Sequence, residues 1–290
     1  MESSTKPQFR SISLPSKLTP ISTRIKLNLD NLNTLIPLCS SVSYQTTFVC
    51  LVDLYLSVDE LISSYRIQQV DLQCNNKLLI EDVLVESTTL LDSCSNLLEF
   101  LALMKKNVRA LQSALRRKGK AIDASGEADI MDYLLYRKKA KKNIMQYLRS
   151  LEKMERETEA CMVSGEDDHL SMVIGVLRQI VSATISVFRG LFFCLSGRTK
   201  VDKGFSLMSR LVPMSRPAYG KIQEITTDVD MIDVTLRSLQ KNKSKSIDVQ
   251  MVTERLLNLD HQIEGYEVEL DSLFRRLIQT RVSLLNILGN

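Results

Sequence analysis

The histidine and cysteine side chains are the groups on this chain best suited to metal binding or nucleophilic catalysis, and they are scattered. The two histidines are His169 and His261, and neither has a Cys, Asp or Glu at a spacing that is typical of a metal site. Glu264 follows His261 by three residues, but charged helix faces commonly produce this spacing. The residues therefore predict no metal centre.

The six cysteines and the missing enzyme motifs point in the same direction. No C-x-x-C pair and no signal-peptide pattern occurs, so we expect reduced and mostly buried thiols rather than a disulfide framework. No G-x-S-x-G, G-x-x-x-x-G-K-[ST] or G-x-G-x-x-G motif supports a hydrolase, a P-loop protein or a dinucleotide-binding fold. We expect a cytoplasmic protein that is not an enzyme and uses no cofactor. The cysteines are Cys39, Cys50, Cys74, Cys94, Cys161 and Cys194.

A basic stretch between residues 105 and 142 is the strongest chemical feature of the sequence. It holds twelve basic residues against four acidic ones, a net charge of +8 in a chain whose total is +4. Such a stretch predicts a surface for an anionic partner, because each basic residue near a charged membrane gains roughly 1 kcal/mol. The candidate residues are Lys105, Lys106, Arg109, Arg116, Arg117, Lys118, Lys120, Arg137, Lys138, Lys139, Lys141 and Lys142.

Several interpretations of the basic stretch stay open. It could be a solvated face that is neutralised by acids elsewhere, including Glu152, Glu155, Glu157 and Glu159. It could instead meet an acidic protein face or anionic lipid headgroups. Nucleic acid has the least support, because no stacking aromatic platform or base-reading motif accompanies the charge.

The elements that must position these residues read as long helices. The chain has only 10 Gly and 6 Pro, so few residues interrupt helices. Apolar residues recur at steps of three and four, which predicts an all-α bundle of long amphipathic antiparallel helices. If two of these helices form a hairpin closed at 119–126, the two halves of the basic stretch lie side by side. The predicted helical runs cover residues 42–65, 76–118, 127–163, 170–195 and 218–242.

The C-terminal helix has the clearest pattern. Its apolar positions from Val252 to Ile287 alternate steps of four and three, which is typical of a coiled-coil-like seam. We expect this seam either to pack into the protein's own bundle or to form a homo-oligomer through residues 252–287. The seam positions are Val252, Leu256, Leu259, Ile263, Tyr266, Leu270, Leu273, Leu277, Thr280, Leu284 and Ile287.

The run 170–195 is the most apolar, and its length would suit a membrane span. Arg178 and Arg189 argue against a span, at roughly 2.5–3.5 kcal/mol for each charge near the middle of a membrane helix. Because they lie about 20° apart around a helix, they form one narrow polar stripe. We predict a central helix of a soluble bundle, with membrane contact through this helix as an alternative.

The chain divides into a tail and a single domain. Residues 1–27 are basic and rich in Ser, Thr and Pro, which predicts a disordered tail, with an organelle transit peptide as the alternative. Residues 28–290 are expected to form one helical-bundle domain. Its main break lies near 196–217, where glycines and prolines gather.

Several sequence blocks carry a family resemblance. They are FRSISLPSKLTP, LQSALRRKGK, DYLLYRKKAKKNI, VLRQIVSATISVFRGL and LFRRLIQTRVSLLNILGN, and they run in order from about residue 9 to residue 290. In these blocks the chain resembles the plant BYPASS-related proteins. The resemblance implies a plant protein linked to root and shoot organ development, with no known cofactor or site residues.

We therefore expect a regulatory or scaffold protein that acts through contacts with protein partners. The alternative is a peripheral membrane protein that docks through residues 105–142 or through the apolar helix 170–195.

Overall fold

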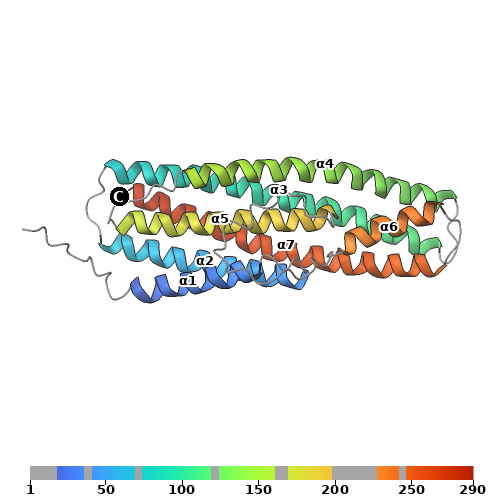
Figure 1. Cartoon of the computed structure of the whole chain (residues 1–290), viewed down its shortest axis with the longest axis horizontal. Helices are drawn as coiled ribbons and strands as arrows, with labels where there is room; N and C mark the ends of the chain where they lie inside the picture. The colour runs from blue at the N-terminus through green and yellow to red at the C-terminus, as the bar shows by residue number, and fades with distance from the viewer. Residues whose placement is uncertain are drawn as a thin grey trace, which may run out of the picture.

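The computed structural model describes residues 18–35, 41–68, 74–118, 124–160, 169–197, 227–241 and 246–289. Within these ranges the secondary structure is helical, which confirms the all-α class (Figure 1). The helices are α1 (Leu18–Leu35), α2 (Ser41–Gln68), α3 (Cys74–Lys118), α4 (Ala124–Ala160), α5 (His169–Ser196), α6 (Asp228–Lys241) and α7 (Ser246–Leu288).

Helices α2 to α5 begin and end close to the predicted runs, because those runs carry an unbroken apolar stripe. The predicted run 218–242 is observed as α6, and the part of it before Thr227 lies outside the described residues. Most of the predicted break near 196–217 lies outside them as well.

Helix α1 differs from the expectation of a tail over residues 1–27, because it begins at Leu18. Residues 1–17 lie outside the described part of the chain. Ile25 and Leu32 are seven residues apart on one face of α1 and are buried. Pro20 falls in the first turn, where a helix needs no backbone N–H donor. The apolar spacing therefore outweighs the polar, Pro-containing composition on which the tail prediction rested.

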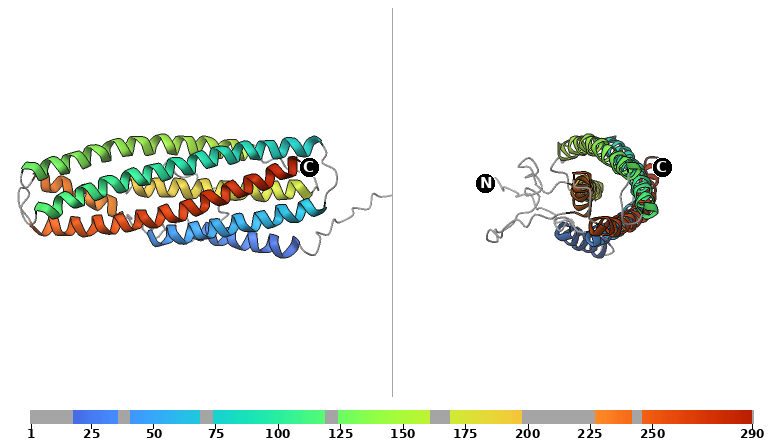
Figure 2. Two further views of the ribbon diagram at one scale, coloured as in Figure 1. Left: turned by 180° about the vertical axis from the view of Figure 1, so that it is seen from behind. Right: turned by 90° about the vertical axis from the view of Figure 1, so that its right-hand side faces the viewer.

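The long helices form a curved layer around a central rod. Figure 2 shows the layer end-on, in the order α4, α3, α7, α2 and α1, which agrees with the packing of neighbouring helices. Helices α5 and α6 follow one another along the concave side of the layer (Figures 1 and 2). A single cluster of buried side chains runs through this concave side and includes residues from every helix.

The predicted seam of α7 faces the protein's own bundle. All its positions from Val252 to Ile287 are buried, and α7 packs against α2, α3 and α6 of the same chain. A homo-oligomer through the same positions would require them to leave those neighbours. The oligomeric state itself stays a prediction.

Helix α5 is the central element that the sequence predicted. Within the described residues, Met172–Ser196 is the one stretch that is long and apolar enough to cross a membrane, and 83% of its most apolar window is buried inside the bundle. Its two arginines are buried as well. Arg178 pairs with Glu86 of α3 (Nε to Oε1, 3.4 Å), and Arg189 pairs with Glu155 of α4. The predicted polar stripe is therefore neutralised by two neighbouring helices.

Candidate anionic-partner surface

The basic stretch lies on two neighbouring antiparallel helices. The C-terminal half of α3 and the N-terminal half of α4 lie alongside each other at the same end of the bundle (Figure 1). The predicted proximity of the two basic halves is therefore observed. The structure nevertheless divides their side chains into two groups with different surroundings.

On α3, two of the predicted cations are held by acids of α7. The Lys105 Nζ lies 2.7 Å from Glu267 Oε2 and 3.6 Å from Glu264 Oε1. The Arg109 Nε lies 2.8 Å from Asp260 Oδ1. The hydrogen bond to Glu267 raises the pKa of Lys105, and the hydrogen bond to Asp260 raises that of Arg109. These two cations link α3 to α7.

On α4, Arg137 is a buried junction between three helices. Its side chain is 1% exposed, and its Nε donates to Asp233 Oδ1 of α6 at 3.1 Å. Its Nη2 donates to the carbonyl oxygens of Leu195 (3.1 Å) and Ser196 (3.3 Å) at the C-terminal end of α5. Those carbonyls have no partner within their own helix, so Arg137 caps α5 while it pairs with α6.

Three groups complete this junction. Lys141 pairs with the other oxygen of Asp233 (Nζ to Oδ2, 3.0 Å). Gly197 ends α5 with a φ of 66°, a conformation that glycine adopts without strain, and a Cβ there would lie 2.7 Å from Asp230 Oδ1. Burial raises the pKa of Tyr136, the neighbour of Arg137 on α4, to about 12, while the positive charge of Arg137 acts in the opposite direction.

Lys105, Arg109, Arg137 and Lys141 form the group that we call the paired set. These residues bind acids of α6 and α7, so their charge serves the fold. Two of the acids that we expected to neutralise the stretch have other neighbours, since Glu155 binds Arg189 and Glu157 binds Lys153. The side chain of Glu159 lies outside the described residues. For these two acids the prediction was wrong, because the pairing of the basic stretch depends on contacts between distant helices.

The remaining described cations form what we call the exposed set. Within the described ranges none of them makes an ion pair, and Arg117 only donates to Ser113 of its own helix (2.8 Å). The side chain of Lys118 and the whole of Lys120 lie outside the described residues. The exposed set consists of Lys106, Arg116, Arg117, Lys138, Lys139 and Lys142.

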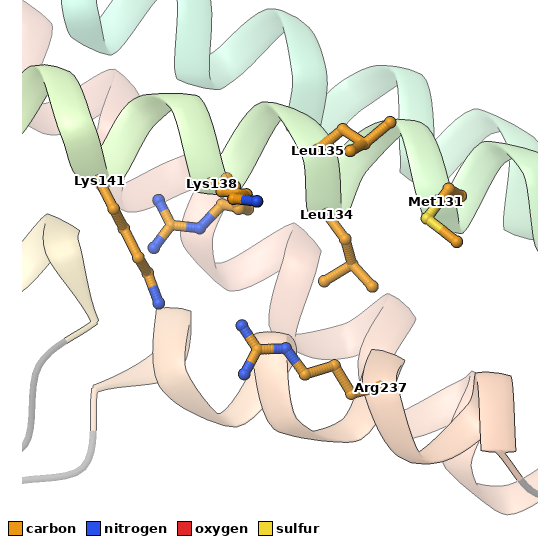
Figure 3. Close-up of a pocket in the computed structure, with 7 residues that line it drawn as sticks. Met131, Leu134, Leu135, Lys138, Lys141 and Arg237 are labelled. Carbon is orange, nitrogen blue, oxygen red and sulfur yellow. The ribbon is translucent and has the colours of Figure 1, made fainter.

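A pocket opens beside the exposed set, between α4 and α6. Its volume is about 310 Å³, and its lining combines cationic and apolar side chains. Figure 3 shows Lys141 and Leu134 reaching from α4 toward α6, and Arg237 reaching back from α6 toward α4. Sequence reasoning missed Arg237, because nothing in the sequence indicates that the run 218–242 lies against α4. The lining residues are Met131, Leu134, Leu135, Arg137, Lys138, Lys141 and Arg237.

A family model described as Protein BPS1 matches residues 47–287 of the chain. The chain belongs to the BPS1 family. No curated protein and no solved structure matches it. The match confirms the resemblance to the plant BYPASS-related proteins, and BPS1 membership implies a plant developmental regulator of unknown mechanism.

The BPS1 match contains both the basic stretch and the pocket, whereas α1 precedes it. In the described part of the chain, no three or more His, Cys, Asp or Glu side chains gather closely enough to hold a metal ion. Among the described residues, the exposed set and the pocket are the features that could bind an anionic partner.

Proposed function

We propose that the protein is a non-enzymatic regulatory or scaffold protein of the plant cytoplasm, and that it binds an acidic protein partner through the exposed set. The observation that supports this proposal is the division of the basic stretch. The paired set is neutralised within the fold, whereas the exposed set presents Lys106, Lys139 and Lys142 without counter-ions in the described residues.

Complementary charge favours such a partner in two ways. A patch of one sign steers an oppositely charged surface into contact, and like-charged partners are repelled. Cations at the edge of an interface act mainly on the association rate and on its dependence on salt. A regulator that binds reversibly is well served by contacts of this kind.

The experiment is proximity labelling in plant cells with a charge-reversed variant. Arg137 and Lys141 are excluded from the reversal because they hold the fold, so the variant is Lys139→Glu with Lys142→Glu. The matched control is Arg149→Glu with Arg156→Glu, which reverses two exposed cations farther along α4. We expect the double reversal to remove a defined group of labelled proteins that the control retains. Identical labelling by both variants would refute the proposal.

Docking on an anionic membrane is the second candidate, because the same exposed cations would attract acidic lipids. Docking through α5 has less support, since that helix would have to withdraw Arg178 and Arg189 from their ion pairs. Co-sedimentation with vesicles of phosphatidylcholine and phosphatidylserine tests the candidate. Binding that fades with added salt and is lost in Lys139→Glu/Lys142→Glu would support it, whereas no binding at low salt would exclude it.

A further inference from the structure

The pocket between α4 and α6 holds cations that the fold does not neutralise. Arg137 and Lys141 share the carboxylate of Asp233. Lys138 and Arg237 make no ion pair within the described ranges, and both are exposed. A second carboxylate, Asp230, lies close enough to Lys141 to interact with its charge. Four cations therefore line the pocket and two carboxylates lie beside them, which leaves an excess of positive charge.

Arg137 adds a separate indication of a missing partner. Its side chain is 1% exposed, yet its Nη1 has no hydrogen-bond partner among the described residues. Its Nε and Nη2 are occupied by Asp233 and by the end of α5. A buried guanidinium nitrogen without an acceptor is costly. Arg137 also lines the pocket, so its positive charge would attract an anion there.

The same pocket has an apolar side. Met131 is 48% exposed and Leu135 is 57% exposed, and both line the pocket together with the half-buried Leu134. Single exposed apolar residues are ordinary on protein surfaces, but here they gather beside cations in a concave site. The volume of about 310 Å³ lies at the lower end of the range for small-molecule sites, roughly 300–1,000 Å³.

We propose that this pocket binds an anionic amphiphile, a molecule with a phosphate or carboxylate head and an apolar body. The head meets Lys138 and Arg237 and lies near Arg137, and the body covers Met131, Leu134 and Leu135. The molecule is either a free amphiphile or the exposed end of a membrane lipid. The pocket shares Lys138 with the exposed set, so the inference is tested at Arg237 and Leu135, which do not belong to that set.

The test is isothermal titration calorimetry of the full chain with decyl phosphate below its micellar concentration. Decanol and inorganic phosphate are the matched probes, since each keeps one half of the ligand. The variants are Arg237→Ala, which removes a head contact, and Leu135→Ser, which removes a body contact. Both positions are exposed, so both variants are expected to fold. Arg149→Ala is the control, because it removes an exposed cation of α4 outside the pocket.

We expect saturable binding of decyl phosphate that weakens about tenfold in Arg237→Ala, because a charge-assisted contact is lost. Leu135→Ser should weaken it about fivefold, and Arg149→Ala should leave it unchanged. Either decanol or inorganic phosphate binding as tightly as decyl phosphate would overturn the proposal, as would equal affinities of Arg237→Ala and the wild type.

A second arm separates the two sources of the ligand. Vesicles of phosphatidylcholine with phosphatidic acid are sedimented with the wild type and with Arg237→Ala. Vesicle binding that is lost in Arg237→Ala identifies a membrane lipid. Arg237-dependent binding of decyl phosphate, without Arg237-dependent binding to vesicles, identifies a free amphiphile. Absence of binding in both arms would overturn the proposal.

Discussion

Replacement of Arg137 by methionine tests the division of the basic stretch at its most buried member. Methionine fills a similar length of side chain but carries no charge. The variant leaves Asp233, whose side chain is 3% exposed, with Lys141 as its remaining cation. It also leaves the carbonyl oxygens of Leu195 and Ser196 without the donor that caps α5.

The expected cost follows from these lost contacts. Breaking a buried ion pair by removing one partner costs about 3–5 kcal/mol. Lys141 still contacts Asp233, so the lower end of that range, about 3 kcal/mol, is expected. For a chain of this size, the entropy of unfolding is about 0.6 kcal/mol per kelvin, so a loss of that magnitude lowers the apparent Tm by about 5 °C. Arg137→Met combined with Asp233→Leu should regain part of the loss, because the double variant leaves no unpaired buried carboxylate.

The assay is thermal unfolding followed by circular dichroism at 222 nm. The matched control is Lys138→Met, which removes the neighbouring but exposed cation and should change the free energy of unfolding by no more than about 0.5 kcal/mol. Two results would refute the reasoning. One is a Tm of Arg137→Met that equals that of Lys138→Met, and the other is a double variant less stable than Arg137→Met alone.

Three further predictions concern other parts of the bundle. Lys105→Glu places a third carboxylate beside Glu267 and Glu264 of α7 and should lower the free energy of unfolding by about 1 kcal/mol. Lys106→Glu should leave the free energy of unfolding unchanged, and urea titrations measure both variants. Burial raises the folded-state pKa of Asp59, so ionisation of this carboxyl group opposes folding. The free energy of unfolding therefore falls as the pH rises from the unfolded pKa of about 3.9 through the higher folded-state pKa. Asp59→Asn should therefore gain Tm over the wild type between pH 4 and pH 7, and a difference that does not change with pH would contradict this. A Cβ at Gly190 would lie 2.7 Å from Tyr44 Oη, so Gly190→Val should cost about 1–3 kcal/mol, whereas Gly175→Ala on the same helix meets nothing within 4 Å and should gain up to about 1 kcal/mol in thermal unfolding.

Most of the fold could be predicted from the sequence because its signals are local. Apolar steps of three and four identify α2 to α5 and the seam of α7, since each stripe is long and uninterrupted. Helix α1 escaped prediction because its Ser, Thr and Pro content resembles a tail. Its buried positions, such as Ile25 and Leu32, are few and widely spaced.

The sequence predicted the basic stretch 105–142 as the candidate site, but not which of its cations are paired within the fold and which are exposed. Whether a cation belongs to the paired set depends on acids that are distant in sequence. Arg137 and Asp233 are separated by 96 positions, Arg109 and Asp260 by 151, and Lys105 and Glu267 by 162. No local pattern encodes these pairs, because they arise from the way α6 and α7 pack against α4 and α3. The pocket escaped prediction for the same reason.

Two lysines that are adjacent in the sequence provide the most direct test of the central claim, that one set of cations holds the fold while the other meets a partner. Lys141 pairs with the buried carboxylate of Asp233, whereas Lys142 is exposed. Tm and proximity labelling in plant cells should be measured together for Lys141→Glu and Lys142→Glu. The account predicts a lowered Tm for Lys141→Glu, and an unchanged Tm with reduced partner labelling for Lys142→Glu. Equal Tm values for the two variants, or wild-type labelling by Lys142→Glu, would contradict it.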